Sequence, residues 1–441
     1  MIKIHTLGGY NETGKNMTAI EVDDEFIVCD MGLHLEPYAK YQDEHGMKNL
    51  TKEVMLKIGA IPDDAKIPKE KVVAIIPSHA HLDHIGAIPF LEFDYKAPIL
   101  CTPFAKEVLT TLAQDVHVQI SNPVIALKNN KQYKTKNATI EFIHVTHSVI
   151  QTIIIAITTK YGTILYANDF KIDKTPTLGE KTDLEKLKKY NVLALICDCI
   201  KAETEEQTPS EAVAKQMLED LFDKHDFSNK TIIISTFSSH IARLKSILQC
   251  AKKINRKILF LGRSLAKYAE AAAAEGIEFK EVEFLKYGDQ IRKQLKKILD
   301  KRHEYLIVAT GHQGEPSAVL AKVVTGKLPL KLEKGDVVIF SSTVIPNEEN
   351  IKNRNTLDEQ LEKKGVVIFK DVHVSGHAAR HDLKEFLKLV HPTHIIPAQA
   401  PEFVQKHLIT LAKEIGYPEE CLHLSYNGNS IVLSSVKQKS L

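Results

Sequence analysis

The chain has 441 residues, with 44% hydrophobic and 26% charged side chains, which is typical of a globular protein of two domains. A mean hydropathy of −0.16 and the lack of any apolar stretch of about 20 residues exclude a multi-span membrane protein. The net charge of +2 excludes wholesale coating of a polyanion but allows a local basic groove. The first ten residues also lack the pattern of a secretory signal. We therefore expect a cytoplasmic protein without a membrane span.

Short β-branched runs, separated by Gly, Asn, Asp and Pro, predict strands through the first half of the chain. They lie at 2–7, 18–21, 26–29, 72–77, 99–101, 139–144, 152–158, 163–166 and 192–197. In this half only the stretches 85–93 and 105–114 have a helical pattern. The first half is therefore expected to be rich in strands.

From about residue 207 the predicted strands alternate with helices. A capping residue, Pro and Glu at 208–211 predict the start of a helix that continues to 224. Further strands are expected at 231–235, 257–260, 305–309, 337–340 and 366–369, and further helices at 241–251, 265–275 and 290–299. This alternation is typical of a parallel, doubly wound sheet.

The last part of the chain has the pattern of two helices and two strands. The helices are expected at 382–389 and 401–415, and the strands at 393–396 and 430–434. We interpret this part as a return to the strand-rich domain. The predicted domain division is therefore 1–206, 207–371 and 372–441, with the middle segment inserted.

The strongest chemical signal directly follows the predicted strand at 72–77. It comprises His79, His81, Asp83 and His84, four potential metal ligands within six residues. Histidines two residues apart in an extended loop can both face one cation, and the Asp–His pair can then face a second. Imidazole and carboxylate together suit Zn²⁺ or Mn²⁺. The motif therefore predicts a two-metal site.

Three more polar residues each follow a predicted strand: Asp30, His147 and Asp169. A carboxylate at Asp169 can bridge two metal ions roughly 3.5–4 Å apart. Asp30 can hold a ligating histidine through the ring nitrogen that faces away from the metal. Each residue alone is equally typical of a turn, but together with the preceding motif they favour a metal site.

These residues and several later segments resemble the metallo-β-lactamase superfamily, and most closely the ribonuclease J family of archaeal type among its β-CASP nucleases. The later segments are Asp198 with its apolar neighbours and the runs at 236–243, 310–316 and 373–378. The resemblance covers essentially the whole chain. It implies an α/β protein in which a β-CASP domain is inserted into a metallo-β-lactamase αββα sandwich.

The resemblance also implies an activity and its cofactor. The expected enzyme is a zinc-dependent ribonuclease that degrades single-stranded RNA by metal-activated attack of water on the phosphodiester. It is expected to act mainly as a 5′-to-3′ exonuclease on 5′-monophosphate ends and to form a homodimer. Two Zn²⁺ sites are implied, with Mn²⁺ or Mg²⁺ as alternative ions. The implied ligands are His79, His81 and His147 for the first ion, Asp83 and His84 for the second, and Asp169 between them.

Three residues are implied in catalysis. Asp83 is expected to orient the attacking water as a base, and Asp198 and His377 to flank the scissile phosphate, where His377 can protonate the leaving side. A pocket for phosphate or RNA is expected from residues with small hydroxyls, imidazoles or backbone N–H groups. These residues are Ser235, Ser238, Ser239, His240, His373, Ser375, Gly376 and His377. For the serines before the helix at 241–251, a simple capping role is the alternative.

The sequence departs from the family at Gln399, where the family pattern has a histidine that completes the second metal site. The carbonyl oxygen of a neutral glutamine is a poor zinc ligand beside imidazole. His394 precedes it by five positions, so an alternating strand would place it on the opposite face. We therefore expect a weakened second metal site and reduced hydrolysis.

Three other functions remain open. One is a DNA nuclease of the same superfamily, because no motif here reports on the 2′-hydroxyl that separates RNA from DNA. Another is a catalytically weakened RNA-binding protein, which only Gln399 supports. A hydrolase of small molecules is the least favoured, since it would not need the long α/β insertion.

Overall fold

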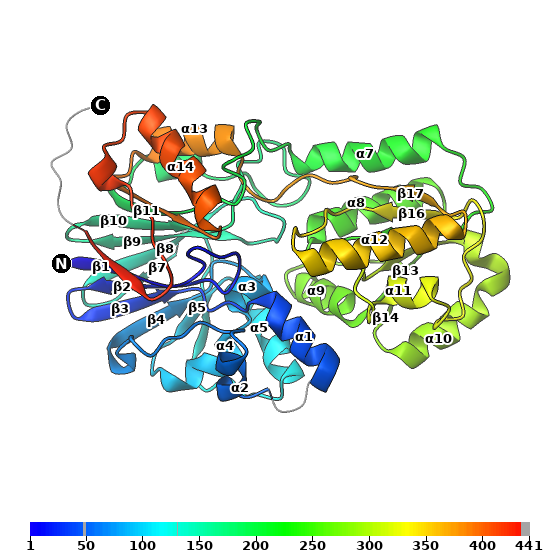
Figure 1. Cartoon of the computed structure of the whole chain (residues 1–441), viewed down its shortest axis with the longest axis horizontal. Coiled ribbons are helices and arrows are strands. Elements are labelled where there is room, and N and C mark those ends of the chain that lie inside the picture. Colours follow the sequence, from blue (N-terminus) through cyan, green and yellow to red (C-terminus); the bar gives the residue numbers. More distant parts are fainter. Residues whose placement is uncertain (47–49, 130, 434–441) are drawn as a thin grey trace. The chain divides into compact units, whose positions relative to one another are not determined.

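The computed structural model describes residues 1–46, 50–129 and 131–433. The chain forms two compact units (Figure 1). The first unit comprises Met1–Lys174, Gly179–Thr208 and the chain from Ser375 onward, and the second comprises Thr175–Leu178 and Pro209–Val374. Within the described ranges, no helix combines the length and the apolar character that crossing a membrane requires.

The first unit contains two sheets, and the larger one has seven strands in the order β19-β1-β2-β3-β4-β5-β6. Its strands are β1 (Ile2–Gly8), β2 (Met17–Val22), β3 (Glu25–Cys29), β4 (Val72–Ile76), β5 (Ile99–Cys101), β6 (Val124–Ala126) and β19 (Asn429–Leu433). Strands β19 to β3 pair antiparallel, whereas β3 to β6 pair parallel. The last strand thus returns to pair with the first; position 434 of its predicted range lies outside the described residues.

The smaller sheet of this unit has the order β18-β11-β10-β9-β8-β7. Its strands are β7 (Gln132–Lys134), β8 (Ala138–His144), β9 (Ile153–Thr159), β10 (Gly162–Ala167), β11 (Val192–Asp198) and β18 (His394–Ala398). One apolar cluster joins the two sheets, with Ile4 and Ile27 from the larger and Phe142 and Ile155 from the smaller. Burial of this surface is the main force that holds the two sheets face to face.

Helices cover the outer faces of both sheets (Figure 1). Phe386 and Leu408, from the two C-terminal helices, pack with Leu195 of β11 in a second apolar cluster. The α-helices are α1 (Leu35–His45), α2 (Lys52–Lys57), α3 (Leu82–Ile85), α4 (Ile88–Leu91), α5 (Pro103–Asp115), α6 (Leu184–Leu187), α13 (Arg380–Val390) and α14 (Glu402–Glu414). Short 3₁₀ turns are η1 (Lys69–Lys71), η2 (Glu92–Asp94) and η4 (Glu419–Cys421). The predicted αββα sandwich is confirmed.

Several details of this unit differ from the sequence prediction. The single helix expected at 85–93 is wrong, because α3 ends at Ile85 and α4 begins at Ile88, with Pro89 in its first turn and no N–H to continue a ladder. Helices α1, α2 and α6 and strands β6 and β7 were not predicted. In α1 most residues are exposed or only partly buried, so this helix has no apolar period to detect.

The second unit is a six-stranded sheet in the order β14-β13-β15-β12-β16-β17, in which every pair is parallel. Its strands are β12 (Ile232–Ser235), β13 (Lys257–Leu261), β14 (Val282–Leu285), β15 (Tyr305–Ala309), β16 (Val337–Phe340) and β17 (Val367–Phe369). Its helices are α7 (Glu211–Lys224), α8 (Ile241–Lys253), α9 (Arg263–Ala274), α10 (Gly288–Lys297), α11 (Val319–Val324) and α12 (Glu348–Lys363), with the 3₁₀ turn η3 (Leu299–Glu304). The predicted parallel, doubly wound sheet is confirmed, whereas β14, α11 and α12 were not predicted.

Candidate metal centre

The loop after β4 carries four potential metal ligands, three histidines and one aspartate. Strand β4 is buried at Ile76, and the chain then bends through 78–81, where His81, with φ and ψ of −77° and 149°, lies immediately before α3. The single turn of α3 carries Asp83 and His84. The bent loop followed by a helical turn lets residues so close in sequence face a common point.

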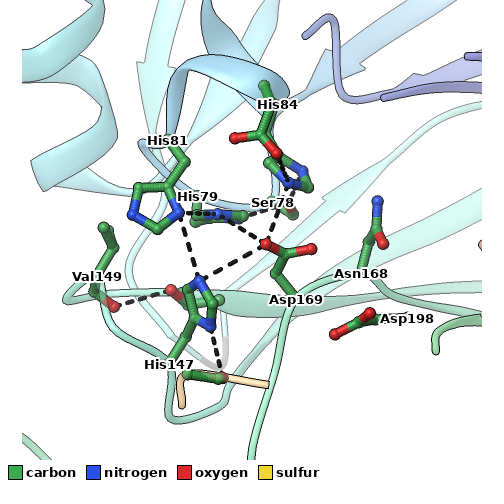
Figure 2. A network of polar contacts seen from close by, with 12 residues as sticks. Ser78, His79, His81, His84, His147, Val149, Asn168, Asp169 and Asp198 are labelled. Atoms are coloured by element: carbon green, nitrogen blue, oxygen red, sulfur yellow. Dashed lines mark hydrogen bonds and ion pairs between the residues drawn. The ribbon is translucent and has the colours of Figure 1, made fainter. Parts of the chain in front are cut away.

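Three imidazoles and one carboxylate converge there, and we call His79, His81, His147 and Asp169 the three-imidazole group (Figure 2). The Nδ1 of His81 lies 3.0 Å from His79 Nε2 and 3.4 Å from His147 Nε2. The Oδ2 of Asp169 lies 3.7 Å from His79 Nε2 and 3.6 Å from His147 Nε2. One nitrogen of each ring and one carboxylate oxygen, all within 4.8 Å of one another, form a donor set that suits a divalent ion.

A second group shares Asp169 with the first and consists of Asp83, His84 and Asp169. The Nε2 of His84 lies 3.4 Å from Asp83 Oδ2 and 3.3 Å from Asp169 Oδ2. His84 is completely buried. Asp169 thus belongs to both candidate groups, as an arrangement with Asp169 between two metal ions would require.

Asp198 and His377 form a pair beside these groups. Asp198 is the last residue of β11, and its Oδ2 lies 2.7 Å from His377 Nδ1. The Nε2 of His377 lies 3.9 Å from Asp169 Oδ2. Burial alone would lower the pKa of His377, but the charges of Asp198 and Asp169 raise it to about 9. In this setting the imidazole carries a proton at neutral pH.

Two histidines of the centre are held from behind by hydrogen bonds. The Nδ1 of His84 lies 2.7 Å from Asp30 Oδ2, and Asp30 also accepts from the Ser78 backbone N–H at 2.6 Å and from the Tyr166 hydroxyl at 2.7 Å. The Nδ1 of His147 donates to the Gly376 carbonyl at 2.7 Å. In both rings Nε2 is therefore the nitrogen that faces the carboxylates, as a metal ligand requires.

Gly376 must be a glycine at this position. A Cβ there would lie 2.9 Å from Cε1 and 3.0 Å from Nδ1 of His147, closer than real Cβ contacts allow. The close approach of this backbone segment is what brings its carbonyl within reach of the imidazole.

The electrostatic setting also suits a metal ion. Burial, together with neighbouring imidazoles, holds the pKa of both His79 and His147 well below the usual value, so both rings are neutral and have a lone pair to offer. The Oδ1 of Asp169 is buried and accepts no hydrogen bond from the described residues. Asp169 also has a left-handed backbone with φ of 61°, which is costly for a residue other than glycine and clusters at functional sites. The three-imidazole group therefore fits a divalent metal ion.

Gln399 lies directly beside the second group. It follows β18, is 1% exposed and has a φ of 64°. Its Nε2 donates to Asp83 Oδ2 at 2.9 Å and lies 3.3 Å from His84 Nε2. His394 does not take its place: the Nδ1 of His394 lies 3.0 Å from His423 Nε2 instead.

The residues expected to bind phosphate are divided between the two units. Ser375, Gly376 and His377 belong to the first unit, where the Ser375 hydroxyl accepts the backbone N–H of His377 at 3.1 Å. The other five belong to the second unit, and two of these are buried with partners of their own. Ser235 donates to the Ala309 carbonyl at 2.8 Å, and His240 Nε2 lies 3.3 Å from Glu211 Oε2.

The remaining three residues of that set differ in their surroundings. Ser238 is partly buried and its hydroxyl lies 2.9 Å from the Ser264 hydroxyl, whereas Ser239 is only 6% exposed. The ring of His373 lies 6.4 Å from that of Phe237, measured between centroids. Of the three serines at 235, 238 and 239, Ser238 is therefore the one whose hydroxyl is most open to a ligand.

Sequence reasoning missed a layer of amides behind the metal groups. The Asn16 Nδ2 donates to the Asp83 carbonyl at 3.0 Å and lies 3.2 Å from His84 Nε2, and the Asn16 Oδ1 accepts from Asn168 at 3.0 Å. Gly14 donates its backbone N–H to Gln399 Oε1 at 3.1 Å. The only signal in the sequence is the density of Gly and Asn between β1 and β2, which is equally typical of a turn.

Arg243 forms a buried ion pair that was not predicted from the sequence. It is completely buried, and its guanidinium binds both carboxylate oxygens of Glu211, at 2.5 and 2.8 Å. It also donates to the Ser341 and Val372 carbonyls, at 3.0 and 3.1 Å. The helix pattern around 241–251 did not reveal this, because the acidic partner lies on another helix.

Family models match three parts of the chain. Residues 10–184 match the metallo-beta-lactamase superfamily. Residues 229–358 match the ribonuclease J beta-CASP domain. Residues 367–423 match the Zn-dependent metallo-hydrolase RNA specificity domain.

Relatives of similar length support the same relationship. The chain is 40% identical to ribonuclease J of Pyrococcus abyssi over 424 residues, covering 95% of this chain and 94% of the relative. It is also 40% identical to ribonuclease J of Methanocaldococcus jannaschii, with 98% of both chains covered. Ribonuclease J 1 of Streptococcus pyogenes is 32% identical, with 98% and 75% covered. A solved structure of a protein of unknown function from Enterococcus faecalis V583 has a TM-score of 0.65 and 18% identity, and covers 98% of this chain and 100% of its own.

Proposed function

The chain belongs to the ribonuclease J family, and from this we infer that it is a metal-dependent ribonuclease. We propose that it degrades single-stranded RNA, mainly from the 5′ end and on 5′-monophosphate ends, with zinc as the ion. The observation that carries the proposal is the three-imidazole group, in which one nitrogen of each ring and the Oδ2 of Asp169 come together at one point. Three imidazoles and one carboxylate are a donor set that suits a divalent metal ion.

The protein's own residues would divide the chemistry between them. His79, His81 and His147, with Asp169, would hold the ion, which when bound acts as a Lewis acid and lowers the pKa of water. Asp83, whose carboxylate lies 3.4 Å from His84 Nε2, would orient the attacking water as its base.

His377 would serve the leaving side. Asp198 holds the proton at Nδ1, across 2.7 Å, so that the charged ring presents its Nε2–H toward the centre. A group that is protonated at neutral pH can donate to the leaving oxygen, which acquires negative charge as the phosphodiester bond breaks. This division of roles uses both members of the Asp198–His377 pair without assigning either to the metal.

The entering end of the RNA is proposed to meet the phosphate-binding residues. Ser238 in the second unit and Ser375 in the first each offer a hydroxyl; that of Ser238 lies beside the Ser264 hydroxyl, and that of Ser375 accepts the His377 backbone N–H.

The test uses RNA labelled at its 3′ end and carrying a 5′-monophosphate, incubated with the protein in zinc and manganese buffers. The proposal expects products that shorten progressively from the 5′ end. It also expects slower degradation of the same RNA with a 5′-triphosphate, and none of the matched DNA. Equal degradation of DNA would move the assignment to a DNA nuclease, and internal fragments alone would contradict the 5′-end preference.

One observation favours a second candidate, a catalytically weakened RNA-binding protein. The Gln399 amide occupies hydrogen-bonding positions on Asp83 and His84 that a second metal ion would need. This candidate expects RNA binding that weakens with added salt, and no turnover at any metal concentration. Turnover by the unaltered chain in the same assay excludes it.

A further inference from the structure

The side-chain amide of Gln399 lies within contact of two of the three members of the second group. Its Nε2 lies 2.9 Å from Asp83 Oδ2 and 3.3 Å from His84 Nε2. The side chain is closed off from solvent, with 1% of the residue exposed. The amide nitrogen therefore lies where Asp83 and His84 present their ligand atoms.

The amide cannot turn round. Its Oε1 accepts the backbone N–H of Gly14 at 3.1 Å, which is a donor and nothing else. In the reversed orientation the NH₂ group would face that N–H, and the carbonyl oxygen would face the Asp83 carboxylate. Two donors would then oppose one another, as would two acceptors, and the buried groups would lose both hydrogen bonds. The Gly14 N–H thus directs the NH₂ group of Gln399 toward the second group.

The backbone at both ends of this contact is fixed. The backbone N–H of Gln399 donates to the Gly9 carbonyl at 2.7 Å, and the neighbouring Ala400 forms a bridge to Tyr10. Gly14 has a φ of 85°, in the left-handed region that favours glycine. Since both partners are held by main chain, the amide is not a mobile side chain that a cation could push aside without cost.

A metal ion at the second group would need lone pairs from every neighbour. The NH₂ group of a carboxamide supplies hydrogens instead, and here it already donates one to Asp83 Oδ2. The amide hydrogen compensates part of the Asp83 charge that a cation would otherwise neutralise. The second group with Gln399 therefore does not fit a tightly bound metal ion.

The three-imidazole group has no such obstacle. Among the described residues, the side-chain hydrogen bonds and close contacts of Gln399 are with Gly14, Asp83 and His84, and none of them involves a ring of the three-imidazole group. The two halves of the centre therefore differ in a way that follows from one residue.

We propose that this chain binds one metal ion, in the three-imidazole group, and that the Gln399 amide, directed by Gly14, takes the place of the second ion. The inference rests on the proposed metal-dependent function. It goes further because it states how many metal ions each chain binds and which residue limits that number.

The test counts zinc bound to the protein, so it needs no activity. Metal-free protein is reloaded with excess zinc, and gel filtration then removes the unbound zinc. The zinc that remains is measured by elemental mass spectrometry and divided by the protein concentration. One zinc per chain is expected for the unaltered protein. Gln399→His and Gln399→Glu are expected to bind two, because each turns a lone pair toward Asp83 and His84, and the glutamate can still accept from Gly14.

Two further variants separate the causes. Gln399→Leu removes the donor without adding a ligand and is expected to stay at one zinc. Gln216→His is a control that adds a histidine on α7 in the second unit, where Gln216 donates a hydrogen bond to Asp220. This variant is also expected to bind one zinc ion. Circular dichroism and thermal unfolding of every variant check that each is folded.

The outcomes are distinct. Two zinc ions in the unaltered chain would overturn the inference and leave the proposed function standing. One zinc in the unaltered chain and also in both Gln399→His and Gln399→Glu would show that the amide is not the cause, and would overturn it as well. No retained zinc in any folded protein would overturn the metal-dependent function, and the inference with it.

Discussion

The Nδ1 of His377 and the Oδ2 of Asp198 lie 2.7 Å apart, and the two residues are separated by 179 positions in the sequence. The pair depends on β11, which ends at Asp198, and on the segment before α13, which carries His377. The carboxylate keeps the ring charged and fixes which nitrogen faces the centre. In the proposed function this relationship makes His377 a proton donor and distinguishes it from the three histidines proposed to bind the metal ion.

If the pair acts as a proton donor, Asp198→Asn should lower the rate of RNA cleavage by about 10²- to 10⁴-fold. The neutral amide no longer stabilises the charged ring. His377→Gln should cost a similar factor, and the double variant should be little worse than either, because the two act as one unit. Single-turnover kinetics measure this; fully multiplicative losses would argue against a joint role.

Replacement of Asp30 should lower the free energy of unfolding of the protein. Asp30 is completely buried and accepts from Ser78, His84 and Tyr166, so Asp30→Ala leaves several buried donors without an acceptor. We expect a loss of about 3 kcal/mol in the free energy of unfolding. Tyr166→Phe, which removes one of these bonds, should cost about 1 kcal/mol. Urea unfolding followed by fluorescence or circular dichroism compares them, and equal losses would contradict the account.

Gly376→Ala should weaken metal binding without unfolding the protein. The added Cβ would meet the His147 ring at 2.9 Å and displace it or the carbonyl that it binds. Disturbing a group that orients a ligand typically costs about 10- to 100-fold in metal affinity. Competition with a zinc chelator measures the dissociation constant. The control is Gly288→Ala, where a Cβ meets nothing within 4 Å; the same loss there would rule out the steric explanation.

The second unit should lose stability in mild acid through His312. Burial and the nearby Arg354 lower the pKa of His312 to about 3, whereas the unfolded chain has a histidine pKa of about 6.5. Between these values the unfolded chain binds more protons, so this contribution is complete above pH 6.5 and is lost as the pH falls toward 3. His312→Gln should flatten that part of the pH dependence. An unchanged slope in the variant would show that other groups control it.

Much of the fold and the metal centre could be predicted because the relevant signals are local. The strand before His79, the spacing of the histidines and the strand ends at Asp30 and Asp169 are all legible in short stretches. The parallel sheet of the second unit follows from alternating periodicities. Helix α1 escaped prediction because its residues are mostly exposed or partly buried and give no apolar period.

What could not be predicted depends on contacts between distant residues. Nothing in the sequence near Gln399 indicates that Gly14, 385 positions away, directs its amide. Nor does the helix of Arg243 indicate a buried pairing with Glu211. The resemblance indicated that Gln399 stands where the family has a metal-binding histidine. Only the geometry shows which groups the Gln399 side chain contacts.

The most direct test of the central claim is a zinc titration of RNA cleavage by metal-free protein. The substrate is 3′-labelled, 5′-monophosphorylated single-stranded RNA, and the rate is plotted against zinc equivalents per chain. The account predicts no cleavage without metal, a rate that rises and levels off at one equivalent, and no cleavage by His79→Ala at the same zinc concentrations. Cleavage that survives removal of the metal, or that His79→Ala leaves unchanged, would contradict the assignment of RNA hydrolysis to the three-imidazole group.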